Sequence, residues 1–388
     1  MCIFQLIAVI KIIVIHHLSI MITSQSTNYT LKMNTKWKIF TCLVAFVLLS
    51  HCKKEELTVK IPDNNFLNAL IQLGIDTDGD GKISYTEAAD IRYLNINDKS
   101  LTNISGIESF INLEVLECAN NKLLKLDVSR NTALTVLDCN ENHLKSLYLS
   151  HNLYLESLSC GWNEINVLDI SNNVALENLL CTYNYFGTLD VSNNIALKTL
   201  SCNYNGLTTL NISANSLLTS LSCDYNLLTS LDISHNPALE YLDCEQNQLS
   251  GINISNNIAL KNLLTNNNQL NALEVTNNIH LEWLSCVGNR LSNLDISENP
   301  DIYYLDCGNN QLASLDLSGN IFLEELHCGG NLLTSLDITR NTYLKGLWLN
   351  GMPSLFKVCV WKMPFPLSIY IVNTTGSPNI YYSTDCSK

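Results

Sequence analysis

Short apolar runs alternate with polar turns along most of the chain, and the pattern repeats every 21 residues. One unit, LESLSCGWNEINVLDISNNVA (residues 155–175), follows the scheme LxxLxCxxNxLxxLDxSxNxx. Residues 158–160 and 168–170 alternate between apolar and polar, which is the two-residue period of a strand. The pattern predicts six inward side chains in this unit: Leu155, Leu158, Cys160, Ile165, Leu168 and Ile170.

A fixed period of this length is typical of a solenoid, in which neighbouring coils cover the apolar face that one coil cannot bury alone. Parallel strands of successive coils would stack ~4.8 Å apart. Because each unit holds two similar halves, little room remains for a helix. We therefore predict an all-β-rich solenoid with two parallel faces of strand or extended chain.

Two asparagine series keep the same period, one from Asn121 to Asn331 and the other from Asn131 to Asn341. Each asparagine follows a predicted strand, where the turning chain leaves backbone groups without partners. An amide side chain offers both donors and an acceptor. We expect each asparagine to bond the backbone of its own coil and of the next coil.

Cysteine occupies one inward position in ten coils, from Cys118 to Cys328, and Thr265 replaces it once. We interpret these residues as buried free thiols that act as small apolar side chains. Disulfides between neighbouring coils are the alternative, but parallel in-register side chains do not bring their Cβ atoms close enough for good geometry. We find no spacing that indicates a zinc site.

The repeat resembles the bacterial leucine-rich repeat family, in its Bacteroidota-type form with 21 residues and a nested half-repeat. The match covers residues 113–349, and the less regular coil at 91–112 (with LTNISGIESFINL) resembles the entry repeat of that family. The solenoid is therefore expected to span residues 91–349. The resemblance implies a fold and a role in recognition, but it names no ligand.

Before the solenoid, DTDGDGKISYTE (residues 76–87) has the ligand spacing of an EF-hand calcium loop. The predicted calcium ligands are Asp76, Asp78, Asp80, the Lys82 carbonyl, Ser84 and Glu87. The apolar spacing over residues 66–73 predicts a helix before the loop. The loop also resembles one calcium repeat of dockerin modules. Residues 61–90 would thus form a helical N-terminal cap stiffened by calcium; an acidic turn without a metal is the alternative.

The N-terminal region has the composition of an export signal. Residues 33–51 place two lysines before a 12-residue apolar stretch, which is too short to span a membrane. Leu49-Ser50-His51-Cys52 resembles a bacterial lipobox, which implies that Cys52 is lipidated and that residues 52–60 form a tether. Plain secretion is the alternative. We expect translation to begin at Met33, with residues 1–32 as an upstream extension.

The repeat pattern breaks at the other end, where Met352 replaces the ladder asparagine and the sequence becomes rich in aromatic residues and proline. A solenoid needs a cap over its last open edge. Cys359 and Cys386 stand outside the cysteine ladder and fit one disulfide in an exported protein. We expect residues 350–388 to form this C-terminal cap, which resembles the caps of related Bacteroidota repeat proteins.

The net charge of the chain limits the classes of partner that it can bind. The chain carries a net charge of −14, and residues 1–51 hold four lysines and no acid, so processing at Cys52 would leave the mature chain more negative still. Such acidity argues against binding nucleic acid or anionic lipid directly. The histidines and serines form no recognisable catalytic triad, and we expect no enzymatic activity.

Four consecutive coils carry an aromatic residue two positions after the ladder cysteine: Trp162, Tyr183, Tyr204 and Tyr225. Such a series suits contacts with protein or with the apolar faces of sugars, while stacking for stability is the alternative. Outward acids before each serine, such as Asp169 and Asp190, are better explained by turns than by a metal-binding face.

Together these features predict a monomeric lipoprotein of the outer membrane or cell surface that is held to the membrane only by its lipid. Its predicted function is to bind protein ligands through the repeat face. Glycan capture through the aromatic series and a structural role as adhesin or spacer are the alternatives.

Overall fold

The computed structural model describes residues 57–365 and 371–386. The chain divides into two units, Met1–Leu57 and Thr58–Lys388, and the description below concerns the second. Cys52 and the predicted signal segment therefore lie outside the described residues. Within the described part, no helix has the length and apolar character needed to cross a membrane.

Two short helices precede the solenoid. Helix α3 (Asn64–Gln72) begins where the Asp63 side chain accepts hydrogen bonds from the next backbone N–H groups, and it buries Phe66 and Leu70. Helix α4 (Tyr85–Asp90) starts with a reciprocal cap between Ser84 and Glu87. The predicted helix over residues 66–73 is thus confirmed, although it starts two residues earlier. Helix α4 follows from the Ser-x-x-Glu spacing, a typical helix start.

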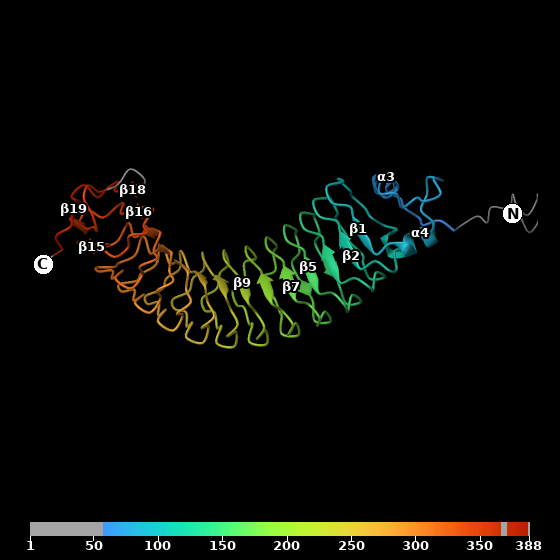
Figure 1. Cartoon of the computed structure of the whole chain (residues 1–388). Helices are drawn as coiled ribbons and strands as arrows, with labels where there is room; N and C mark the ends of the chain where they lie inside the picture. The colour runs from blue at the N-terminus through green and yellow to red at the C-terminus, as the bar shows by residue number, and fades with distance from the viewer. Residues whose placement is uncertain (1–56, 366–370, 387–388) are drawn as a thin grey trace, which may run out of the picture. The chain divides into compact units, whose positions relative to one another are not determined.

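One face of the solenoid is a parallel sheet with one strand for each coil (Figure 1). Equivalent leucines pair in register from coil to coil, as Leu158 does with Leu179. The fourteen strands, in their order in the sheet, are β1 (Tyr93–Asn95), β2 (Val115–Glu117), β3 (Val136–Asp138), β5 (Ser157–Ser159), β7 (Asn178–Leu180), β8 (Thr199–Ser201), β9 (Ser220–Ser222), β10 (Tyr241–Asp243), β11 (Asn262–Leu264), β12 (Trp283–Ser285), β13 (Tyr304–Asp306), β14 (Glu325–His327), β16 (Gly346–Trp348) and β18 (Ile371–Asn373).

The opposite face is mostly extended chain with a few short strands. Strands β4 (Leu147–Tyr148) and β6 (Leu168–Asp169) pair there, and β15 (Ser335–Asp337), β17 (Lys357–Cys359) and β19 (Tyr381–Ser383) form a second small sheet. A 3-10 turn, η2 (Ile107–Ser109), occupies this side of the entry coil. The predicted solenoid with two parallel faces is confirmed. Both sheets also continue past residue 349, because β17, β18 and β19 belong to the segment that was expected to act as a cap.

The interior is a stack of apolar side chains from equivalent positions of successive coils. All six predicted inward residues of the unit at 155–175 are buried, as are their equivalents in the neighbouring coils. The ten ladder cysteines are free and buried, and Thr265 is buried at the same position. Burial raises the pKa of the Cys160 thiol to about 12, with a further contribution from Asp138. The interpretation of these cysteines as core residues is confirmed.

The asparagines connect the coils. The Nδ2 group of Asn163 donates to the Cys160 carbonyl of its own coil at 3.1 Å and to the Cys139 carbonyl of the preceding coil at 3.0 Å, while Oδ1 accepts from Leu144 N–H at 2.9 Å. In the second series, Asn173 Nδ2 donates to two carbonyls of the preceding coil. Bonding to the coil's own backbone is confirmed for the first series, but the inter-coil bonds run to the preceding coil, not to the next.

We predict that the ladder thiols resist labelling in the folded protein, because they are buried and their pKa values are raised. A thiol reagent applied at neutral pH should modify none of the ten until a denaturant is added. Rapid labelling of ten thiols in the native protein would contradict the buried core.

Candidate functional site

Four aromatic residues form a continuous ladder beside the sheet. Trp162, Tyr183, Tyr204 and Tyr225, here called the aromatic ladder, follow strands β5, β7, β8 and β9. Neighbouring ring centroids are 3.7, 4.0 and 4.1 Å apart with nearly parallel planes. Together with Tyr185, these rings line a shallow hollow of about 520 Å³. The structure therefore brings together the four residues predicted from the sequence.

The backbone of the aromatic ladder is left-handed. All four residues have φ between 51° and 54°. Bulky side chains rarely adopt this conformation, which costs roughly 1–2 kcal/mol for a residue with a Cβ atom. Several other coils place Asn or Gly at the equivalent position, such as Asn120, Asn267 and Gly288. The four coils thus hold aromatic side chains where the backbone favours small or amide residues.

A second outward surface lies over strands β10 to β14. In one row, the strand register places Tyr241, Asn262, Trp283, Tyr304 and Glu325 side by side; in the other, it places Asp243, Leu264, Ser285, Asp306 and His327. The Trp283 and Tyr304 rings stack at 3.6 Å, and His327 stacks on Trp348 at 3.8 Å. We call these two rows, with Asp224, Glu245 and Asn266 beside them, the acidic–aromatic face.

Three carboxylates at one end of this face are partly or largely buried. Asp224 is only 8 % exposed, and its Oδ1 atom has no hydrogen-bond partner. Asp243 accepts a bond from Glu245 N–H at 3.2 Å. Glu245 accepts one from Asn266 Nδ2, and Asn266 Oδ1 in turn accepts from the Ser285 hydroxyl. Among the described residues, no lysine or arginine forms an ion pair with any of the three carboxylates.

Burial raises the pKa of all three carboxyl groups, so they stay protonated to a higher pH than usual. Burial, followed by the negative charge of Asp243, raises the pKa of Asp224 to about 6. Burial and the charges of Asp243 and Asp224 raise the pKa of Glu245 to about 7, against the opposing hydrogen bond from Asn266. These acids were not among the site residues predicted from the sequence. They lie one residue before or after the ladder cysteine, so comparison of those two columns across coils could have found them.

The predicted calcium loop folds compactly. One carboxylate oxygen from each of Asp76, Asp78 and Asp80 lies within 4.8 Å of the others. Glu87 lies outside this group: Oε1 accepts from Thr77 N–H and hydroxyl, and Oε2 accepts from Ser84 N–H. Although partial burial would raise the pKa of Glu87, the hydrogen bonds from Ser84 and Thr77 lower it to about 2. The three aspartates fit the hard oxygen ligands that calcium prefers.

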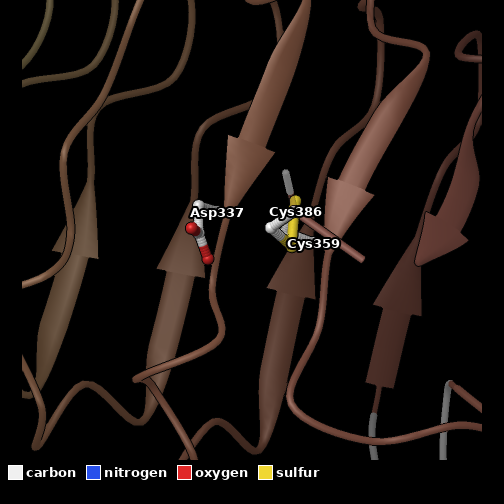
Figure 2. A group of neighbouring side chains, drawn as sticks. All are labelled: Asp337, Cys359 and Cys386. Atoms are coloured by element: carbon white, nitrogen blue, oxygen red, sulfur yellow. A yellow bond between two sulfur atoms is a disulfide. The ribbon is translucent and has the colours of Figure 1, made fainter. Parts of the chain in front are cut away.

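Asp337 lies beside the disulfide between Cys359 and Cys386 (Figure 2). The disulfide confirms the pairing predicted from the sequence. Asp337 accepts hydrogen bonds from Thr339 N–H and hydroxyl. Because only the thiolate form of cysteine is a good metal ligand, this oxidised group is not a metal centre.

The outward acids of the other face stabilise turns. Asp169 and Asp190 each accept a hydrogen bond from the N–H group two residues ahead, as do Asp127, Asp232, Asp295 and Asp316. Asn211 and Asn253 accept the same bond in other coils. The interpretation of this series as turn residues is confirmed at these positions.

Solved structures with a similar fold are leucine-rich repeat proteins. The functional domain of InlJ from Listeria monocytogenes, whose title mentions a cysteine ladder, is 29% identical with a TM-score of 0.62, over 78% of this chain and 76% of that one. The internalin InlF from the same species is 20% identical with a TM-score of 0.70, over 87% of this chain and 100% of that one. The plant peptide hormone receptor RGFR1, solved with RGF2, is 20% identical with a TM-score of 0.57, over 73% of this chain and 54% of that one.

These similarities establish a leucine-rich repeat solenoid as the fold of the chain. No protein-family model and no curated protein matches the sequence.

We predict that the raised pKa values of Asp224 and Glu245 make the fold less stable as the pH rises. Between the ordinary carboxyl pKa near 4 and the folded values of about 6 and about 7, the folded state binds more protons than the unfolded state, so stability falls with rising pH. Thermal unfolding at pH 5 and pH 8 should show this loss, and the Asp224→Asn/Glu245→Gln variant should lose less. If the wild type and the variant changed in parallel, the two acids would not be responsible.

Proposed function

We propose that this chain is an exported, non-catalytic recognition module that binds a protein ligand through its repeat face. One observation carries the proposal: four aromatic residues occupy left-handed backbone positions in consecutive coils, although Asn or Gly would occupy those positions with less strain. The left-handed position recurs in the other coils, so the local feature is the run of bulky rings placed on it; strained residues of this kind often cluster at binding surfaces. The similarity to receptor ectodomains and internalins supports a role in recognition through the fold they share.

The geometry of the aromatic ladder favours protein over glycan. Sugars are usually bound against the flat faces of aromatic rings. Here the rings stack on one another, so their inner faces are covered, while Trp162 and Tyr225 at the two ends of the ladder stay exposed. Ring edges and hydroxyl groups suit the mixed polar and apolar surface of a protein.

The N-terminal region adds a membrane anchor and a calcium site to the proposal. Cys52 would carry a lipid that anchors the module in the bacterial envelope, so the solenoid would face the exterior as a monomer. Asp76, Asp78 and Asp80 would hold one calcium ion, with Lys82, Ser84 and Glu87 completing the sequence pattern of ligands. When bound, calcium would offset the repulsion among the three carboxylates and stiffen the segment between α3 and α4.

The first prediction concerns the aromatic ladder. Tyr183→Asn/Tyr204→Asn should weaken binding of the partner that co-purifies from native envelopes at least tenfold, since buried aromatic anchors contribute about 2 kcal/mol or more at a hot spot. Asparagine suits the left-handed backbone, so the melting temperature should hold. Gln246→Asn, at the equivalent position one coil further on, is the matched control. Unchanged binding together with a sharp fall in melting temperature would identify the ladder as a stabilising stack.

The second prediction concerns calcium. Calorimetry should detect one site, and the melting temperature should be higher with calcium than with chelator. Asp76→Asn/Asp80→Asn should abolish both effects, while Asp90→Asn, an exposed acid at the end of α4, should leave them intact. These substitutions spare Glu87, which also caps α4. Equal melting temperatures with calcium and chelator would remove the structural role of the ion.

The third prediction concerns the anchor. Cys52→Ser should move the protein from the membrane fraction to the soluble fraction, whereas Cys42→Ser, within the same apolar segment, should not. Mass spectrometry of the mature N-terminus would identify the lipid. Tight membrane association of Cys52→Ser would show that the anchor assignment is wrong.

A further inference from the structure

Three carboxylates of the acidic–aromatic face have no cationic partner in the described part of the chain. Asp224, Asp243 and Glu245 come from adjacent coils, and the lysines and arginines that form ion pairs do so with other acids, as Lys261 does with Glu240. Asp224 is more than nine-tenths buried and keeps one carboxylate oxygen without a partner. A buried carboxylate of this kind is costly to charge unless a cation reaches it.

The arrangement of these acids is too open for a single metal ion. A calcium ion needs six to eight oxygen ligands at about 2.3–2.6 Å. Among the described residues, the carboxylates that converge within 4.8 Å are those of Asp76, Asp78 and Asp80, and the three acids of this face form no such group. Glu245 is also engaged by Asn266, which directs it along the face. Separate cationic side chains, each meeting one carboxylate, fit this spacing better.

Aromatic rings flank the carboxylates on the same face. Trp283 and Tyr304 stack on strands β12 and β13, in the row beside the one that holds Asp243 and Asp306. Trp283 also meets Tyr303 edge to face, at 6.1 Å between ring centroids. Guanidinium and ammonium groups bind the faces of such rings through cation–π attraction, with Trp the best partner.

Tyr303 leads into a neighbouring hollow of about 510 Å³. Its lining consists of three acids and three aromatic rings: Glu282, Asp301, Tyr303, Phe322, Glu324 and Tyr343. Of its acids, Glu324 is paired with Lys345. A surface and an adjoining hollow built from the same two residue classes therefore lie next to each other, joined at Trp283.

We propose that the acidic–aromatic face binds an extended, basic peptide segment of a partner protein, whose arginine or lysine side chains meet Asp224, Asp243 and Glu245 and lie against Trp283 and Tyr304. The coils of Asp224 and Asp306 are four strand steps apart, or ~19 Å at the usual spacing. An extended segment of about six residues covers that length. The inference rests on the proposed recognition function and adds a second surface, which begins at Asp224 beside the last ring of the aromatic ladder.

The test uses the full-length chain and a synthetic octapeptide in which arginine alternates with glycine. Fluorescence anisotropy of the labelled peptide at pH 8 and moderate salt gives the affinity. Asp224→Asn/Asp243→Asn/Glu245→Gln should weaken binding at least tenfold. Trp283→Leu should weaken it severalfold with the charge unchanged, and an octapeptide with glutamate in place of arginine should not bind.

The matched control removes the same charge elsewhere. Asp169→Asn/Asp190→Asn/Asp295→Asn changes three turn acids on the opposite face, at positions that Asn211 and Asn253 already fill in other coils. This variant should bind the arginine peptide within about twofold of wild type. If both triple variants weakened binding equally, attraction to the net charge alone would explain it, and the proposal would fall.

Two further outcomes separate the alternatives. If calorimetry detected calcium binding that was lost in the triple variant of Asp224, Asp243 and Glu245, the cluster would be a metal site. That result would overturn the peptide proposal. If this variant bound the arginine peptide as tightly as the wild type, the inference would be overturned. The proposed function would stand if binding of the natural partner still depended on Tyr183 and Tyr204.

Discussion

Each coil of the solenoid turns twice, and at each turn a buried asparagine amide takes up carbonyl groups that no strand neighbour reaches. The Asn163 side chain makes bonds to its own and to the preceding coil, and Asn173 bonds the preceding coil from the other turn. An unpaired buried polar group costs about 1–3 kcal/mol, so two asparagines in each coil decide whether the turns can be buried at all. The register of the sheet depends on this constraint.

Fixing the interior in this way leaves the outward positions free to vary. Two outward surfaces have diverged from the repeat in local blocks. The aromatic ladder occupies four coils, and the acidic–aromatic face begins in the last of these, at Asp224, and continues through the coils that follow. A stability device tied to the repeat would be expected in every coil, whereas recognition needs different chemistry at different places along the stack. The local character of both blocks is why we assign them to binding.

Much of the fold could be predicted because the same pattern of apolar and polar positions recurs every 21 residues. The inward position of Leu158 and Cys160, the helix before the calcium loop and the pairing of Cys359 with Cys386 all follow from local pattern. The direction of the asparagine hydrogen bonds could not be predicted, because an amide side chain can reach either neighbouring coil. Asp224 and Glu245 were missed because their burial and their raised pKa values arise only when adjacent coils stack, whereas each coil read alone shows only ordinary outward acids.

Amide hydrogen exchange tests the role of the asparagines most directly. Leu144 N–H lies beyond the sheet and donates only to Asn163 Oδ1 among the bonds described here. The account predicts that it exchanges as slowly as the strand amide of Val136. In Asn163→Ala the Leu144 amide should exchange at least a hundredfold faster. Replacement of the exposed Asn172 by alanine should leave its exchange rate unchanged. Fast exchange of Leu144 in the wild type, or equal protection in Asn163→Ala, would contradict the view that buried asparagines hold the coils together.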